Sequence, residues 1–210
     1  MVHTVIVSAL VAVVLSFLSV YGSAQTFCPY RYVTAECQLR TNPSTENPPS
    51  QITGWVTFRQ SVTITCQRLG VLYMHVQIQG LIGDANSHYG IHVHESADIS
   101  DGCESMGPHY NPLLASHGSP TNSFDMRHIG DFGNVYLDSD GLVNITTIDY
   151  LANLVGQHSI LGRGLVLHAM RDDLGLGEVP DSKTTGNSGA RLACCGIRRA
   201  KTRKTIVGGQ

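Results

Sequence analysis

The strongest constraint on the fold of this chain is a set of six histidines that a single site would have to gather from distant segments. They are six of the ten histidines in 210 residues, and one carboxylate follows the fifth of them by three positions. Neutral imidazole is the commonest protein ligand for copper and zinc, and seven ligands are too many for one tetrahedral ion. The pattern therefore predicts two metal ions that share a ligand. The residues are His92, His94, His109, His117, His128, Asp131 and His168.

The local context of these residues divides them into a strand-borne and a loop-borne set. His92 and His94 are separated by one residue in a strand-like run, so both imidazoles project from the same face. His168 ends a second apolar run and can meet them across a sheet. The other four ligands span a loop that a metal would hold in place. Three nitrogens with one carboxylate suit a closed zinc site, whereas three or four nitrogens with an open position suit Cu(II).

Short runs of alternating polar and apolar residues predict an all-β fold. Only 14% of residues are charged and 22 are glycine, which suits a loop-rich β protein better than a helical bundle. About eight antiparallel strands in a sandwich or barrel are expected, with a hairpin turn at 138–141. The expected strands are 52–58, 61–66, 71–81, 90–94, 134–137, 142–148, 159–168 and 190–197.

Two long segments interrupt this strand pattern, at 95–130 and 170–189. Loops of this length inside a compact domain are usually functional or disordered. The first carries three of the candidate histidine ligands, so a metal that organises it would explain its length. The second contains Asp172, Asp173 and Lys183, which suit a charged wall around a site.

The N-terminus predicts secretion. An apolar run from Val5 to about Val20 precedes small residues and a cleavage site after Ala24. The absence of Lys and Arg before the run leaves an uncleaved anchor as the alternative. In an oxidising compartment, the six cysteines are expected to form three disulfides. The expected organisation is a signal peptide (1–24), an irregular lead-in with disulfide cysteines (25–50), one domain (51–197) and a basic tail (198–210).

The tail concentrates five cations in seven residues. Setting these five aside leaves nine basic residues against 16 acidic ones, so the body of the chain is acidic. The tail could bind a heparin-like sulfated polysaccharide or an anionic cell surface, or it could be merely solvated. No nucleic-acid partner is expected. Asn144 begins a glycosylation sequon, which a secreted chain could use unless strand burial blocks it.

Six longer motifs contain most of these residues in a fixed order: GIHVHE, GCESMGPHYNP, HGSP, RHIGDFGN, LGRGLVLHAMRDDLG and GNSGARLACC. Together they resemble the copper/zinc superoxide dismutase family. The double cysteine of RLACC and the ECQL and TGWVTFRQ segments are similar to its secreted, extracellular branch rather than to the cytosolic one. The resemblance covers about 51–197. It implies an eight-stranded antiparallel Greek-key β-barrel with two long functional loops.

The resemblance also implies two ligand sets joined by a shared imidazolate. It assigns copper to His92, His94, His109 and His168. It assigns zinc to His109, His117, His128 and Asp131. Asp172 matches the carboxylate that links one ligand of each set and orients both. Arg191 matches the guanidinium beside copper that docks the anionic substrate.

Two disulfides follow from the same resemblance. Cys103 would pair with Cys194, and closing this loop would stabilise the fold by about 4–5 kcal/mol in the chain-entropy model. Cys37 would pair with Cys195, as in the secreted branch. The last two cysteines, Cys28 and Cys66, would then pair by elimination.

The implied activity is conversion of superoxide to O2 and H2O2 by redox cycling of copper, with zinc in a structural role. His109 would deliver a proton to the departing peroxide, and Arg191 would raise the encounter rate with superoxide. The alternative is a secreted copper/zinc carrier on the same fold with little or no dismutase activity. The complete copper set together with Arg191 favours the enzyme.

The chain departs from the family pattern in three places. Ser96 and Ala97 replace an aromatic-glycine pair, and Asp181, Lys183 and Thr184 stand where the substrate-guiding loop usually carries two acids and a lysine. The apolar stretch after the last cysteine is replaced by 196–199, GIRR. In the family this stretch contributes to the common dimer interface, and burying unpaired arginines there is costly. Any homo-oligomer is therefore expected to use a non-standard interface.

Overall fold

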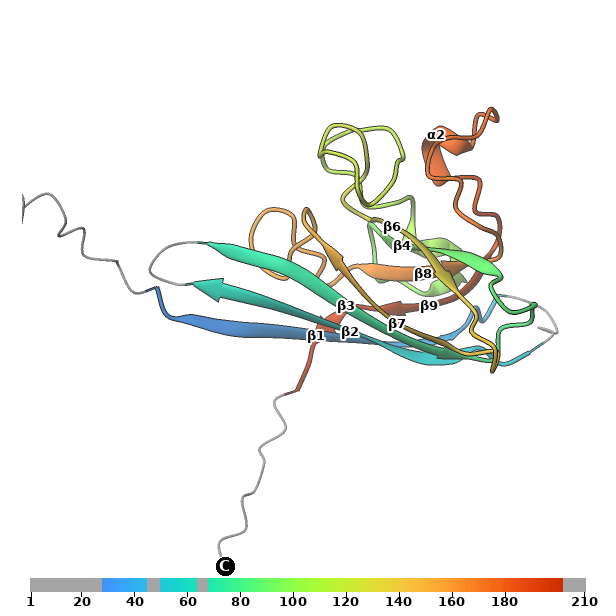
Figure 1. Cartoon of the computed structure of the whole chain (residues 1–210), viewed down its shortest axis with the longest axis horizontal. Coiled ribbons are helices and arrows are strands. Elements are labelled where there is room, and N and C mark those ends of the chain that lie inside the picture. Colours follow the sequence, from blue (N-terminus) through green and yellow to red (C-terminus); the bar gives the residue numbers. More distant parts are fainter. Residues whose placement is uncertain (1–27, 45–49, 64–67, 202–210) are drawn as a thin grey trace, which may run out of the picture.

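The computed structural model describes residues 28–44, 50–63 and 68–201, and nearly all of its regular structure is β-strand (Figure 1). Two short helical turns, η1 (Glu104–Met106) and α2 (Ser182–Thr185), lie in the long loops. In the described part of the chain, no helix has the length and apolar character needed to cross a membrane. The strands are β1 (Tyr30–Thr41), β2 (Thr53–Thr63), β3 (Leu69–Gln79), β4 (His88–His94), β5 (Ser100–Cys103), β6 (Asp131–Tyr136), β7 (Val143–Asp149), β8 (Gly164–His168), β9 (Arg191–Gly196) and β10 (Arg198–Arg199).

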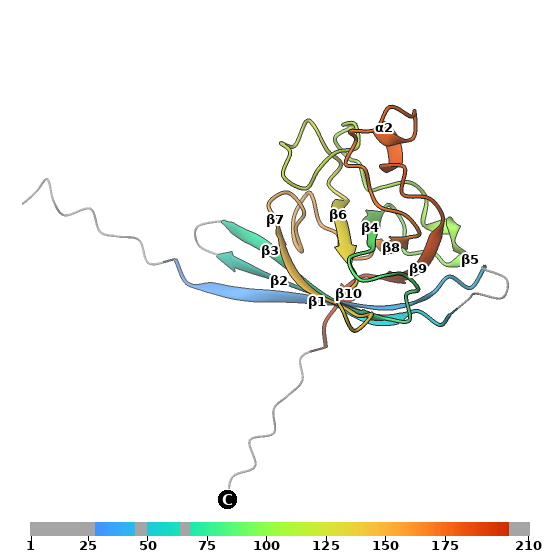
Figure 2. The ribbon, with the colours of Figure 1, turned by 45° about the vertical axis from the view of Figure 1, so that its right-hand side comes forward.

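Eight of these strands form one antiparallel sheet in the order β6-β4-β8-β9-β1-β2-β3-β7, and β10 adds to β1. The sheet curls so that its two ends, β6 and β7, approach each other (Figure 2). Strands distant in sequence are neighbours in the sheet, as β4 is to β8 and β3 is to β7. The predicted all-β, eight-stranded Greek-key barrel is therefore confirmed.

The structure differs from the irregular lead-in expected at 25–50, because Tyr30–Thr41 within it forms a strand of 12 residues. It pairs with β2 from Tyr30 opposite Thr63 to Arg40 opposite Thr53. The inward positions are Val33, Ala35, Cys37 and Leu39. The alternation is present in the sequence, but small and charged residues weaken the signal. The barrel therefore begins near residue 30 rather than at 51.

The β2 strand also differs from the expectation of two separate runs at 52–58 and 61–66. One strand, Thr53–Thr63, spans most of the first run and the start of the second, with a bulge between Gln60 and Val62 in its pairing with β3. Gln60 is buried, and its side chain bonds to Gly70 and Asn153. Gln60, which lies between the two expected runs, is therefore a core residue whose side chain is satisfied by hydrogen bonds.

The hairpin expected around 138–141 is only partly correct. The turn is present, with Asp138 N donating to Leu142 O at 2.8 Å. However, in the described pairings β6 bonds to β4 and β7 to β3, so the turn joins the two ends of the sheet. Phe132 and Ile148, one from each strand, line a small cavity together with Pro120 of the first loop.

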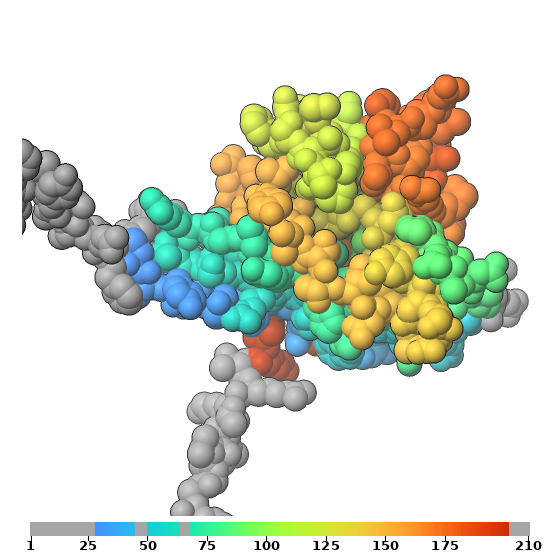
Figure 3. Space-filling view, viewed as in Figure 1, coloured from blue at the N-terminus to red at the C-terminus, as the bar shows by residue number. Residues whose placement is uncertain are grey.

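The two long loops lie on the same side of the barrel, over β4, β6 and β8 (Figure 2). In the space-filling view they form two neighbouring lobes, drawn in yellow-green and orange (Figure 3). The barrel interior is filled by apolar side chains such as Val56, Phe58, Ile91 and Leu167. The site expected from the histidines lies between this barrel wall and the loops. The expected signal peptide, residues 1–24, and most of the expected basic tail lie outside the described residues.

Candidate metal centre

The barrel wall supplies three of the candidate ligands. His92 and His94 lie on β4, which is paired on both sides, and their exposures are 0% and 1%. The alternate residues Ile91 and Val93 face the core, so the two imidazoles point from the barrel towards the loops. His168 ends the neighbouring strand β8, as expected from the sequence. A rigid strand pair thus fixes these three rings.

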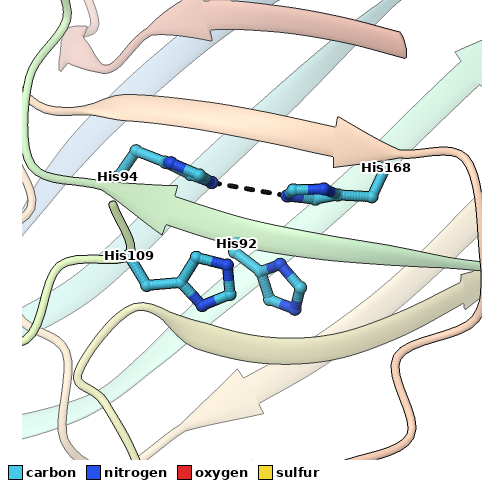
Figure 4. Close-up of side chains that lie close together, drawn as sticks. All are labelled: His92, His94, His109 and His168. Carbon is cyan, nitrogen blue, oxygen red and sulfur yellow. Dashed lines mark hydrogen bonds between the residues drawn. The ribbon is translucent and has the colours of Figure 1, made fainter. Parts of the chain in front are cut away.

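The first loop delivers the fourth ring of this group. The isolated bridge between His94 and His109 lays the loop against the end of β4. Candidate ligand atoms of His92, His94, His109 and His168 all lie within 4.8 Å of one another. Figure 4 shows the four rings converging, and His94 Nε2 lies 3.4 Å from His168 Nε2.

A second group surrounds the carboxylate of Asp131, which is fully buried at the start of β6. One oxygen, Oδ1, lies 3.0 Å from His109 Nδ1, 2.9 Å from His117 Nδ1 and 3.1 Å from His128 Nδ1. The other oxygen accepts the backbone N–H groups of Gly118 and His128. His109 belongs to both groups, and its two ring nitrogens are therefore placed to serve one group each.

The carboxylate of Asp172 contacts one histidine of each group. Its oxygens lie 2.9 Å from His92 Nε2 and 2.8 Å from His117 Nε2. Its backbone is held by a pair of hydrogen bonds with the amide side chain of Asn134. A single buried carboxylate therefore sets the ring orientation of one histidine from each group.

The unpartnered atoms of the site test whether metal ions fit it. His92 Nδ1, His109 Nε2 and His117 Nδ1 are buried without a hydrogen-bond partner, although His117 Nδ1 lies near Asp131. The first group is completed by His94 and His168, whose Nδ1 atoms bond to the carbonyls of Gly107 and Gly189. Each of these rings keeps one nitrogen for a ligand and gives the other to an acceptor. This donor set fits Cu(II) in the first group and a closed zinc site in the second.

The electrostatics of the first group favour neutral imidazoles, which metal binding requires. Burial lowers the pKa of His94, His109 and His168, and positive charge on neighbouring histidines lowers it further. The pKa of His109 falls to about 3.

The carboxylates of the second group act in the opposite direction. Burial alone would lower the pKa of His117, but hydrogen bonds with Asp131 and Asp172 outweigh it and raise the pKa to about 9. Burial would likewise raise the pKa of both carboxyls, yet their histidine partners hold it well below the usual range. Both carboxylates are therefore ionised, as zinc ligation and ring orientation need.

Arg191, at the start of β9, is fixed by the first loop. It donates to the carbonyls of Cys103 and Gly107, each at 2.7 Å, and its Nε lies 3.4 Å from Glu104. The same Gly107 carbonyl accepts the hydrogen bond of His94 Nδ1 at 2.8 Å. Burial lowers the pKa of Arg191, but a guanidinium remains charged.

Two disulfides tie the loop and β1 to β9. Cys103 and Cys194, separated by 91 residues, anchor the loop segment that holds Arg191. Cys37 on β1 bonds to Cys195 on β9. Cys28 is disulfide-bonded, but Cys66 lies outside the described residues, so the Cys28–Cys66 pairing stays a prediction.

Several groups that position the candidate ligands were not predicted from the sequence. Two of them are backbone carbonyls, and a third is a glycine that matters because it has no side chain. The carbonyls of Gly107 and Gly189 orient ligand rings, and Asn134 holds Asp172. Gly186 makes the closest approach, since a Cβ there would lie 2.0 Å from Asp172 Oδ1 and 2.5 Å from His117 Nε2. The only signal for these residues is their presence in the motifs beside the ligands.

Most positions that depart from the family pattern lie at or near the surface, but Ile197 in the 196–199 segment is buried in the core at 1% exposure. Lys183, in α2, donates to the carbonyl of Gly175, and its own carbonyl accepts the N–H of His117. Arg198, in β10, is exposed and forms an ion pair with Glu36 at 3.3 Å. Asn144, on β7, is exposed and lies 3.0 Å from His75, so strand burial does not block its sequon.

Comparison with known proteins agrees with this geometry. The family model for copper/zinc superoxide dismutase (SODC) matches residues 52–197. The extracellular Cu-Zn superoxide dismutase of Drosophila melanogaster is 43% identical over 145 residues, which are 69% of this chain and 75% of that protein. Its counterpart from Caenorhabditis elegans is 44% identical over 146 residues, 70% of this chain and 61% of that protein.

A solved structure extends the match. The crystal structure of the clock protein EA4 superposes with a TM-score of 0.66 and 37% sequence identity, covering 80% of this chain and 95% of that chain. A matching family model over most of the chain, together with the same barrel, leaves one assignment. This chain belongs to the copper/zinc superoxide dismutase family.

Proposed function

We propose that this chain is a secreted superoxide dismutase that uses copper as its redox metal and zinc as a structural metal. The observation that supports this most is the meeting of two buried ligand groups at one residue, His109. The proposed copper ligands are His92, His94, His109 and His168. The proposed zinc ligands are His109, His117, His128 and Asp131.

His109 is proposed to carry a proton as well as to bridge. When bound, copper supplies the one-electron couple that oxidises one superoxide to O2 and reduces a second to H2O2. The second half of this reaction needs protons at the departing oxygens. His109 Nε2 is buried towards the copper group without a hydrogen-bond partner, while Asp131 holds Nδ1 at 3.0 Å. Its burial, which lowers its pKa, favours release of the proton to peroxide.

Arg191 is proposed to attract and dock superoxide. Its side chain is 18% exposed, so the guanidinium presents charge at the surface while carbonyls of the first loop fix it. Burial and neighbouring histidines are larger causes of the lowered pKa of His94 and His168. The positive charge of Arg191 also lowers both pKa values, so Arg191 lies within electrostatic reach of the copper group. A fixed cation at the entrance to a site raises the rate at which a small anion encounters that site by about 10–1000-fold.

The zinc group and its neighbours are proposed to hold the site in shape. One carboxylate oxygen of Asp131 lies within 3.1 Å of three histidines, and Asp172 ties His92 to His117. These contacts order the first loop against β4. Orientation by such partners typically changes metal affinity by about 10–100-fold.

Secretion is supported by the N-terminal apolar run, the disulfides and the extracellular relatives in Drosophila melanogaster and Caenorhabditis elegans. The exposed sequon at Asn144 is a proposed glycan site. The basic tail is a proposed contact for heparin-like polysaccharide or an anionic cell surface, and any homo-oligomer is proposed to avoid the face that contains Arg198. Truncation after Ala200 keeps β10 and should greatly reduce salt-sensitive retention on heparin, and unchanged retention would exclude residues 201–210 as the binding element.

One experiment separates the enzyme from a copper/zinc carrier. Metal content and superoxide dismutation are measured on the same purified sample of secreted protein. One copper and one zinc per chain with fast turnover is the expected result. Zinc alone, or copper without turnover, would contradict the proposed enzyme and favour the carrier.

A further inference from the structure

Met170 is an oxidisable side chain close to the proposed copper ligands that the proposed chemistry does not use. It follows His168 by two residues, and its side chain is 46% exposed. Its N–H donates to the carbonyl of Ser188, and its carbonyl accepts the N–H of Gly90, both at 2.9 Å. These bonds fix the backbone of Met170 between Gly90, in β4, and Ser188, near the end of the second loop.

The thioether of Met170 rests on Gly189. A Cβ built at Gly189 would lie 3.0 Å from Met170 Cε and 3.5 Å from its Sδ, so the side chain covers this glycine. The carbonyl of Gly189 accepts the hydrogen bond of His168 Nδ1 at 3.2 Å. Met170 therefore packs against the residue that orients a proposed copper ligand and leaves its Nε2 free to bind.

Thioethers react with hydrogen peroxide to give sulfoxides. The sulfur lone pair takes one oxygen atom, the O–O bond breaks, and the second oxygen leaves as water. Hydrogen peroxide is the product of the proposed dismutation, so the inference rests on the proposed function for the source of its oxidant. A sulfoxide is polar and chiral, and it disrupts the apolar contact that the thioether made.

We propose that Met170 is a site of peroxide modification, and that its sulfoxide displaces Gly189, loosens the hydrogen bond donated by His168 and weakens copper binding. The other methionines in the described part of the chain provide controls. Met74 and Met106 are 2% and 0% exposed, whereas Met126 is 57% exposed. Met126 lies in the first loop, on the side of the zinc group, and is therefore the matched control.

The test uses full-length secreted protein freed of metals, so that copper does not drive oxidation of its own ligands. The protein is treated with reagent hydrogen peroxide and cleared with catalase, and added oxygen is mapped by peptide mass spectrometry. Copper affinity is then measured by competition with a chelator. Met170 and Met126 should gain oxygen while Met74 and Met106 do not. Affinity should fall about tenfold in the wild type and in Met126→Leu, and Met170→Leu should keep its affinity.

Three results would overturn the proposal. They are an unmodified Met170 in samples where Met126 is oxidised, an oxidised Met170 with unchanged copper affinity, and equal loss of affinity in Met170→Leu and the wild type. Dismutation is assayed separately on untreated protein. An inactive enzyme would refute the proposed function, whereas the oxygen map and the copper affinity would still decide the role of Met170.

Discussion

At the scale of single residues, the candidate centre is defined by the groups that hold the ring nitrogens not offered as ligands. Asp172 holds two of them, and backbone carbonyls hold those of His94 and His168. Sequence spacing could predict the candidate ligands that the structure brings together, because the residue type itself specifies an imidazole. It could not predict the carbonyl acceptors, because any residue has a carbonyl and only the folded loop aims it.

The clearest consequence concerns Asp172. Replacing it by Asn leaves one oxygen to accept a hydrogen bond where two histidines need one each. We expect Asp172→Asn to lower the affinity for copper and for zinc by about 10–100-fold, measured by chelator competition. Asp173→Asn is the control, since Asp173 bonds to Ser182 and Gly175 rather than to histidine. Equal affinities in the two variants would contradict the bridging role.

At the scale of elements, the alternation of residues predicted most strands but not their partners. β4 and β8 were expected from GIHVH and LVLH, and both are present. β1 was missed because Ala35 and Cys37 weaken its apolar face. The supposed hairpin was mispaired, because the short turn at 138–141 gives no sign that β6 and β7 bond to other neighbours. Local patterns thus predict strands, whereas long-range pairing decides the barrel.

Gly186 is the residue at which the backbone of the second loop closely approaches the candidate site. Its φ is +65°, and a Cβ would collide with Asp172 and His117. We expect Gly186→Ala to reduce the zinc retained on dialysis, because the carboxylate and the ring must move apart. Gly156→Ala separates this effect from backbone strain, since Gly156 has φ +81° but open space around it. Similar zinc loss in both variants would mean that strain alone matters.

The two described disulfides are expected to have different roles, because they connect different segments to β9. Removing Cys37–Cys195 or Cys103–Cys194 should each lower the free energy of unfolding by about 2–5 kcal/mol, measured by urea denaturation. Only removal of Cys103–Cys194 should also lower the dismutation rate strongly, because it frees the carbonyls that fix Arg191. Equal rates in the two double-alanine variants would refute this division.

At the scale of the whole molecule, the buried histidines make the stability of the metal-free protein depend on pH. His94, His109 and His168 have lowered pKa values, so the unfolded chain binds more protons than the fold below about pH 6.5. Stability therefore falls as the pH decreases from there. His117 has the opposite sign, because its raised pKa makes its contribution fade between about pH 6.5 and about 9.

Thermal unfolding of the metal-free protein should therefore show its highest Tm near neutral pH. We expect Tm to fall towards about pH 5 because three neutral histidines must be protonated in the unfolded state. Circular dichroism at a series of pH values measures this. A Tm that stays constant or rises between about pH 7 and 5 would show that these histidines are not held neutral by the fold.

His109 is proposed to belong to both ligand groups and to serve the chemistry. The most direct measurement compares the dismutation rate of His109→Ala with that of the wild type, both reconstituted with copper and zinc and both analysed for metal content. We expect a rate lower by about 100–10,000-fold, because the bridge and the proton donor are lost together. A variant that binds both metals and turns over at the wild-type rate would contradict it.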